Sequence, residues 1–197
     1  VLITHMEHHS NIVPWQQLAE RTGARVRWVD IDDQGRLDME SLRAQLSERT
    51  RLLAVTAVSN VLGTINPLAE IIELAHQKGT RVLVDAAQAI PHMPLSVSQL
   101  DVDFLAFSGH KMLGPTGVGV LYVKSSILEQ MPAFLGGGGM IHRVSREGFE
   151  VATVPARFES GTPPISQVLG LSAAIEYLQG IGLQAIHDHE QQLAGAA

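Results

Sequence analysis

The feature that most restricts the fold of this chain is an alternation of short apolar runs with segments of helical periodicity. Continuous apolar runs that alternate with helices of about a dozen residues are typical of α/β proteins. We therefore predict a three-layer α/β/α fold with a mostly parallel sheet covered on both faces. The runs are rich in β-branched residues and cover residues 1–6, 24–31, 51–60, 81–85, 101–107 and 117–123.

The segments between these runs predict the helices. Asp38 is placed to cap the second helix, and Gly79 to stop the third. Residues 132–164, with four consecutive glycines and a Pro-Pro pair, predict a long irregular segment. The helices are expected at residues 14–21, 39–47, 67–79, 125–131, 165–180 and 182–194.

Charge and composition exclude several classes of protein. The net charge of −6 argues against a nucleic-acid surface, because phosphate binding needs a basic face. No apolar run approaches the roughly 20 residues that span a bilayer, and no signal-like start is present. We therefore expect a cytoplasmic protein that binds neither nucleic acid nor membrane. The absence of cysteine excludes disulfides, thiolate metal sites and a cysteine nucleophile from these residues.

The chain begins directly with an apolar run and stops within a helical pattern. We expect it to be a piece of a longer protein.

Polar residues follow four of the predicted strands, where open α/β sheets place their ligand sites. Each of them also has an ordinary structural interpretation. Asp85 could cap a helix, Asn60 could belong to a turn, and Lys111 could be solvated. His8 and His9 are too close in sequence to favour a zinc site, and we predict no metal. The residues that follow the strands are Glu7, His8, His9, Asn60, Asp85, Gln88, Ser108, His110 and Lys111.

Taken together, these residues suit a pyridoxal phosphate site. A lysine amine can form a Schiff base with an aldehyde cofactor, and Lys111 is the candidate. The cofactor then needs a carboxylate against its pyridine nitrogen, which Asp85 can supply. It also needs a group stacked on the ring, a donor to the ring oxygen and donors to the phosphate. By residue type, His8 suits the ring, Gln88 or Asn60 suits the ring oxygen, and Ser108 with His110 suits the phosphate.

A family resemblance rests on VLVDAAQA and SGHKMLGPTGVGVLYV, in which Asp85 and Lys111 are 26 positions apart. These motifs resemble the large domain of fold-type I, class V aminotransferase-family enzymes. MEHHSNIVPW, AVSNVLGTINPL, GGGGMI and RFESGTP resemble SufS-type (group II) cysteine desulfurases. The resemblance runs from about residue 3 to at least residue 180. It implies that residues 1–180 are the central part of the cofactor-binding large domain. Residues 181–197 would begin a helix that leads to a C-terminal small domain.

The resemblance also implies roles. Lys111 would hold the cofactor covalently, Asp85 would pair with the pyridine nitrogen, and His8 would stack on the ring. The other positions would be Asn60 and Gln88 near the phenolic oxygen, Ser108 and His110 at the phosphate, and Thr162 at the phosphate of the other subunit of a homodimer. Family enzymes convert L-cysteine to L-alanine and a persulfide, which supplies sulfur to an acceptor protein for iron–sulfur cluster assembly.

Three features of these enzymes are absent from the chain: the nucleophilic cysteine, the arginine that binds the substrate carboxylate, and an upstream glycine–threonine turn. Leu113 and Ala86 also differ from common choices. The 197 residues alone are therefore expected to be inactive. The alternatives are a selenocysteine lyase acting on L-selenocysteine, an aminotransferase, a kynureninase-like hydrolase, or a non-catalytic fragment for cofactor binding or dimerisation.

Overall fold

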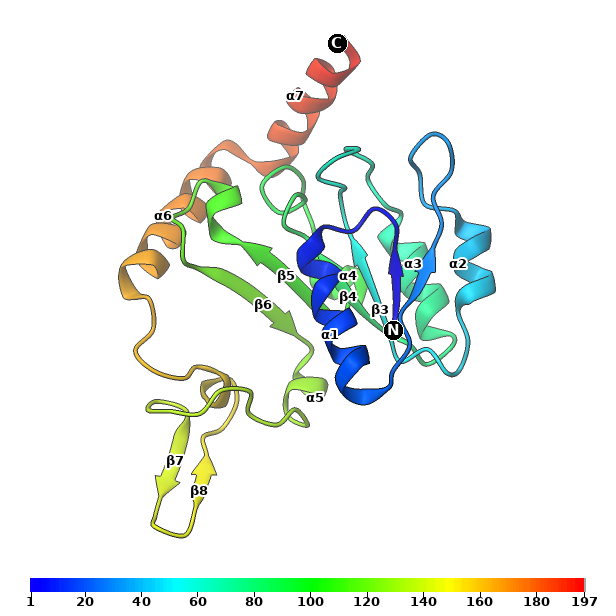
Figure 1. Ribbon diagram of the computed structural model, residues 1–197. Helices are drawn as coiled ribbons and strands as arrows, with labels where there is room; N and C mark the ends of the chain where they lie inside the picture. The colour runs from blue at the N-terminus through cyan, green and yellow to red at the C-terminus, as the bar shows by residue number, and fades with distance from the viewer. Residues whose placement is uncertain (197) are drawn as a thin grey trace.

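The computed structural model describes residues 1–196 and shows a central six-stranded sheet with helices around it (Figure 1). The strands stand in the order β2-β1-β3-β4-β5-β6. The pairs among β1 to β5 are parallel, and β6 pairs antiparallel with β5. The predicted mostly parallel α/β fold is confirmed. The bounds are β1 Leu2–Thr4, β2 Arg27–Val29, β3 Leu52–Thr56, β4 Arg81–Asp85, β5 Phe104–Ser108 and β6 Gly119–Val123.

The helices lie close to their predicted positions. Asp38 caps α2 as predicted, because its carboxylate accepts hydrogen bonds from the backbone N–H groups of Glu40 and Ser41. The short helix α4 and three 3₁₀ helices were not predicted. None of the helices in residues 1–196 is both long and apolar enough to cross a lipid bilayer. The bounds are α1 Val13–Thr22, α2 Met39–Gln45, α3 Leu68–His76, α4 Val97–Leu100, α5 Ser125–Leu128, α6 Ile165–Ile181 and α7 Leu183–Ala196, with η1 His9–Asn11, η2 Gly109–Met112 and η3 Ala156–Phe158.

One face of the sheet carries the main core. Val82, Val84 and Leu105 alternate with less buried neighbours along β4 and β5, as one face of a pleated strand requires. They belong to the same buried cluster as Ile71 and Ile72 of α3. The apolar stripe that predicted α3 is therefore the stripe that covers this face.

The opposite face of the sheet is covered along β1 and β3, where Ile3, Ala54 and Thr56 are buried, and is less covered at the ends of β4 and β5. Leu83, Asp85 and Ala106 point to this side and are half-buried. The helix α1 lies over it (Figure 1). It has no buried residue, and half of its side chains are polar. An open face beside strand ends leaves room for a ligand.

Residues 132–164 are not wholly irregular as predicted. They contain an antiparallel hairpin formed by β7 Ile141–Val144 and β8 Phe149–Val151. The hairpin projects from one end of the molecule, and α7 extends from the other (Figure 1). Val144 and Phe149 are 65% and 63% exposed, so these strands lack the buried apolar face that makes a strand recognisable in a sequence.

Candidate active site

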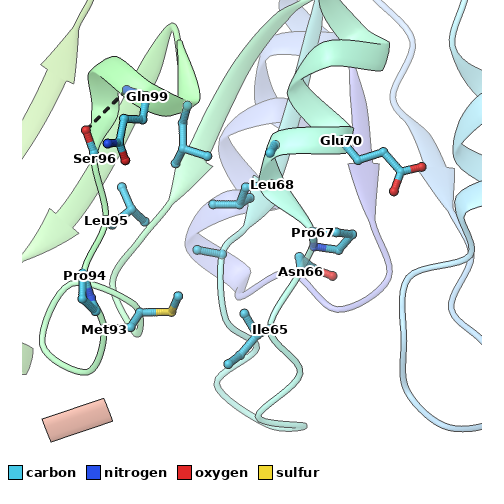
Figure 2. A pocket seen from close by; sticks show the side chains of 13 residues that line it. Ile65, Asn66, Pro67, Leu68, Glu70, Met93, Pro94, Leu95, Ser96 and Gln99 are labelled. Atoms are coloured by element: carbon cyan, nitrogen blue, oxygen red, sulfur yellow. Dashed lines mark hydrogen bonds between the residues drawn. The ribbon is translucent and has the colours of Figure 1, made fainter. Parts of the chain in front are cut away.

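Several cavities of similar volume open on the described surface, so their lining chemistry, not their volume, distinguishes them. One of about 590 Å³ lies between the start of α3 and the segment that leads into α4 (Figure 2). Its wall is mainly apolar, with Ile65, Leu68, Met93 and Leu95 among the lining side chains. It contains none of the residues predicted to form the site.

A cavity of about 540 Å³ brings together five of the eight predicted site residues. It lies where β4 and β5 end, on the partly covered face of the sheet. Ser10, Asn11 and Trp15 also line it, and they were not predicted. The five predicted residues are His8, Asp85, Ser108, His110 and Lys111.

Strand register explains why Asp85 faces this cavity. Asp85 is the last residue of β4 and pairs with Ala106 of β5. Paired residues share a face of the sheet, and so do residues two apart along a strand. Asp85, Ala106 and Ser108 therefore lie on the same face, and all three are half-buried lining residues.

Two close backbone approaches shape the loop that carries Lys111. The Gly109 N–H donates to the Val118 carbonyl at 2.9 Å, and the Gly114 N–H donates to the Gly109 carbonyl at 3.0 Å. A Cβ atom on Gly109 would lie 3.0 Å from the Val118 oxygen, and one on Gly114 would lie 2.8 Å from the Gly109 oxygen. Larger residues would push the loop open, so these glycines fix where Lys111 points.

The carboxylate of Asp85 has a structural role as well as a place in the cavity. Its Oδ1 accepts a hydrogen bond from the backbone N–H of Ala87 at 2.9 Å. The helix-cap interpretation considered for this residue is wrong, because no helix begins there, and the carboxylate instead holds the turn that follows β4. Within residues 1–196, Lys111 forms no salt bridge with any carboxylate, so its amine and Asp85 share the cavity without pairing.

His8 is held at the mouth of the cavity by the turn that follows β1. Its Nδ1 accepts a hydrogen bond from the Ser10 backbone N–H at 3.2 Å and lies 2.8 Å from Ser10 Oγ. The ring is exposed and lines the cavity. It is therefore free to contact a ligand.

Glu7 is buried directly behind this turn, at 7% exposure. Burial raises the pKa of Glu7, and hydrogen bonds from Thr4, Thr56 and Asn11 lower it. Burial is the larger effect, so the pKa is about 7. The charge of Asp85 adds a smaller upward contribution. Sequence reasoning noted Glu7 only as one residue of a strand end. The signal that could have singled it out is an acidic residue three positions after the apolar run LIT and four positions before Asn11.

The three remaining predicted residues lie elsewhere. Asn60 and Gln88 line a second cavity of about 520 Å³, together with His187 and Glu190 of α7. His92 joins the two sides of this cavity, because its Nδ1 lies 2.7 Å from Glu190 Oε1. Thr162 is exposed and lines neither cavity.

No group of three or more histidine, aspartate or glutamate side chains in residues 1–196 is arranged to hold a metal ion.

Comparison with known proteins defines the class to which this fold and this cavity belong. Residues 1–197 match the aminotransferase class-V family over their whole length, and the chain belongs to that family. Its relatives include a cysteine desulfurase of Escherichia coli (strain K12 / DH10B), which is 54% identical over 98% of this chain and 48% of the relative. The chain spans about half the length of the curated relatives it matches.

The chain is also similar to solved structures of cysteine desulfurases and of a protein that carries a PLP cofactor. The cysteine desulfurase CsdA from Escherichia coli aligns with a TM-score of 0.91 and 46% identity, over 93% of this chain and 46% of that one. A C-DES mutant with glycine covalently linked to its PLP-cofactor aligns with a TM-score of 0.79 and 32% identity, over 92% of this chain and 49% of that one.

The donor set of the cavity fits such a cofactor. It offers an amine for an aldehyde, a carboxylate for a pyridine nitrogen, an imidazole face for a ring, and a hydroxyl and a second imidazole for a phosphate. These groups are supplied by Lys111, Asp85, His8, Ser108 and His110.

Proposed function

We propose that this chain carries the cofactor site of a pyridoxal-phosphate-dependent cysteine desulfurase. The observation that carries the proposal is that Asp85 and Lys111 face one cavity from the ends of neighbouring strands, with His8 at its mouth. Homology supports the reaction, since a relative at 54% identity and structural neighbours at 46% and 41% identity are cysteine desulfurases.

The proposed roles follow from the side chains. The amine of Lys111 holds the aldehyde carbon of the cofactor, the carboxylate of Asp85 keeps the pyridine nitrogen protonated, and the ring of His8 stacks on the cofactor. The cofactor, when bound, supplies an electron sink for the substrate carbon. Among the other candidates, Ser108 and His110 bind the phosphate. For Asn60 and Gln88 near the phenolic oxygen, and for Thr162 at the phosphate of the other subunit, the proposal rests on the family resemblance alone, because none of the three lines this cavity.

The proposed substrate is L-cysteine or L-selenocysteine. For cysteine, the C–S bond breaks, L-alanine leaves, and sulfur passes to a thiol as a persulfide. Because residues 1–197 contain no cysteine, that thiol belongs to a part of the protein outside them. In this arrangement residues 1–180 form the large domain, and residues 181–197 lead towards a small domain that supplies the thiol.

We assign the protein to the SufS-type group because of the EHH, GGGGMI and ESGTP motifs. The proposal includes a cytoplasmic homodimer that passes sulfur to an acceptor protein for iron–sulfur cluster assembly. The large exposed apolar side chains of α6, which include Leu169 and Tyr177, support a subunit interface on that helix.

The test is to mix the full-length protein with pyridoxal phosphate, reduce with borohydride and map the labelled peptide by mass spectrometry. We expect one label, on Lys111. Lys111→Ala should remove both the label and the visible absorbance, whereas Lys78→Ala, at an exposed position after α3, should keep both. Labels scattered over several lysines would contradict the proposed site. A correct label without alanine formation from L-cysteine would contradict the proposed reaction but not the site.

A further inference from the structure

A buried hydrogen-bond network lies behind the cavity. Glu7 Oε1 accepts from Thr4 Oγ1 at 2.6 Å and from the Thr56 backbone N–H at 3.0 Å. Glu7 Oε2 accepts from Asn11 Nδ2 at 2.6 Å. Asn11 Oδ1 in turn accepts from Trp15 Nε1 at 3.1 Å. The network therefore joins β1, β3 and the start of α1 through one carboxylate.

The geometry ties the network to His8. Asn11 donates its backbone N–H to the His8 carbonyl at 2.8 Å, and donates its side-chain N–H to Glu7. The backbone of His8 is thus held between Glu7, its neighbour in the chain, and Asn11, which is bonded to both. Asn11 and Trp15 also line the cavity, so the network reaches its wall.

Stability alone does not account for a carboxylate here. Glu7, Asn11, Thr56 and Thr4 are 7%, 4%, 5% and 0% exposed. An ionised group at such a position carries a desolvation penalty of several kcal/mol, and well-packed apolar residues often replace such groups at no cost. The position is costlier still because the charge of Asp85 acts on Glu7. Locally unfavourable choices of this kind concentrate at functional sites.

We propose, resting on the cofactor site proposed above, that Glu7 is a positioning residue that fixes the 7–11 turn and so sets how the His8 ring lies against the bound cofactor. Glu7 itself does not line the cavity. It acts through Asn11, whose two hydrogen bonds hold the turn. The carboxylate suits this task because all three of its partners are donors, and an ionised carboxyl group offers only acceptors.

The direction of these hydrogen bonds provides a sharp test. In Glu7→Gln, the new amide must place its N–H₂ group against Asn11 Nδ2, because Oε1 is already engaged by Thr4 and Thr56. Flipping the Asn11 amide does not help, because Nδ2 would then face Trp15 Nε1. The double variant Glu7→Gln/Asn11→Asp restores an acceptor opposite every donor, while it moves the charge from position 7 to position 11. Rescue by the double variant therefore separates geometry from charge.

The experiment uses the full-length protein loaded with pyridoxal phosphate, with Glu48→Gln as the control at an exposed position. The main measurement is the visible circular dichroism per bound cofactor, which reports how rigidly the ring is held. We expect Glu7→Gln to keep the label on Lys111, to lose about half or more of this signal, and to lower kcat on the order of tenfold to a hundredfold, as small misplacements do. The double variant should recover most of both, and Glu48→Gln should match the wild type.

The outcomes separate the two proposals. If the wild type carries no label on Lys111, the cofactor site is wrong. If the wild type is labelled but Glu7→Gln keeps its full signal and kcat, or the double variant recovers neither, Glu7 is not a positioning residue. Should Glu7→Gln fail to fold, Trp15→Phe tests the same network, because it removes the donor to Asn11 Oδ1 and keeps an aromatic ring in the cavity wall. Its visible signal should fall while its melting temperature holds, and an unchanged signal would overturn the inference.

Discussion

At the scale of single residues, Lys111 and Asp85 reach one cavity by different means. Asp85 faces it because of its position in β4, since the pleat alone decides the side on which it emerges. Lys111 lies beyond the end of β5, and its direction depends on a loop with close glycine contacts. Substitutions near Lys111 should therefore disturb the site through the backbone.

Gly114→Ala is the clearest case. The added Cβ would lie 2.8 Å from the Gly109 oxygen and 3.1 Å from Leu171 Cδ1, so the loop must shift. We expect a loss of about 1–3 kcal/mol in the free energy of unfolding, measured by chemical denaturation. The control is Gly180→Ala in α6, where an added Cβ would meet nothing within 4 Å. This substitution should increase the free energy of unfolding by at most about 1 kcal/mol, because alanine favours the helix more than glycine does. Equal effects at both positions would contradict the packing explanation.

Glu7 predicts a pH dependence of stability. Its pKa rises from 4.5 to about 7 on folding, so the folded state binds more protons between these values than the unfolded state does. The contribution of Glu7 is therefore most favourable at low pH and declines as pH rises from 4.5 to about 7, by about 3 kcal/mol. The difference in unfolding free energy between the wild type and Glu7→Gln should fall across this range. A difference that is independent of pH would show that the carboxylate is not perturbed.

At the scale of elements, local signals decided what the sequence could predict. The strand β4 was predicted to the residue and the start of α3 to within one residue, because a continuous apolar run and a helical apolar stripe are visible in the sequence itself. The end of α3 was predicted at Gly79, three residues beyond His76, where the helix ends. The hairpin of β7 and β8 was missed because its apolar residues are exposed. The helix α4 was also missed, since it has only four residues and no apolar period.

The cap of α2 gives a prediction at this scale. Asp38→Ala removes the acceptor of two N–H groups at 2.9 and 3.0 Å and should cost about 1 kcal/mol of stability. Asp33→Ala, an exposed aspartate in the preceding turn, should stay within about 0.5 kcal/mol of the wild type. Thermal and chemical denaturation of both variants measure the difference. A cap contribution no larger than that of Asp33 would contradict the assignment.

At the scale of the whole molecule, the sequence predicted which residue types form a site but not how they divide between cavities. Strand ends could be read from apolar runs, which placed His8, Asp85 and Lys111 in one region. The separation of Asn60 and Gln88 depends on α7 and His92 closing a second cavity. The Glu7 network depends on which strands flank β1. Both arise from contacts between segments far apart in the chain, which periodicity does not report.

The edge strand β6 leads to a prediction about association. Its Val120 and Leu121 are 39% and 56% exposed, and exposed apolar edge strands pair with other chains. We expect residues 1–197, expressed alone, to form oligomers. Leu121→Lys should shift the distribution towards monomer in light scattering. Val61→Lys, at a residue that is 82% exposed in a turn, should leave it unchanged. Equal effects of the two lysines would indicate that only net charge matters.

The pairing of β4 with β5 has a consequence for the abundance of the protein. The floor of the cavity exists only while these two strands are paired. A ligand of the cavity therefore binds the folded state and not the unfolded state. By mass action, cofactor at a hundred times its dissociation constant adds about 2.7 kcal/mol to the apparent stability. In a cell with little pyridoxal phosphate, a larger fraction of the newly synthesised chains would therefore be unfolded. Proteases would degrade those chains, and the steady-state amount of the protein would be lower.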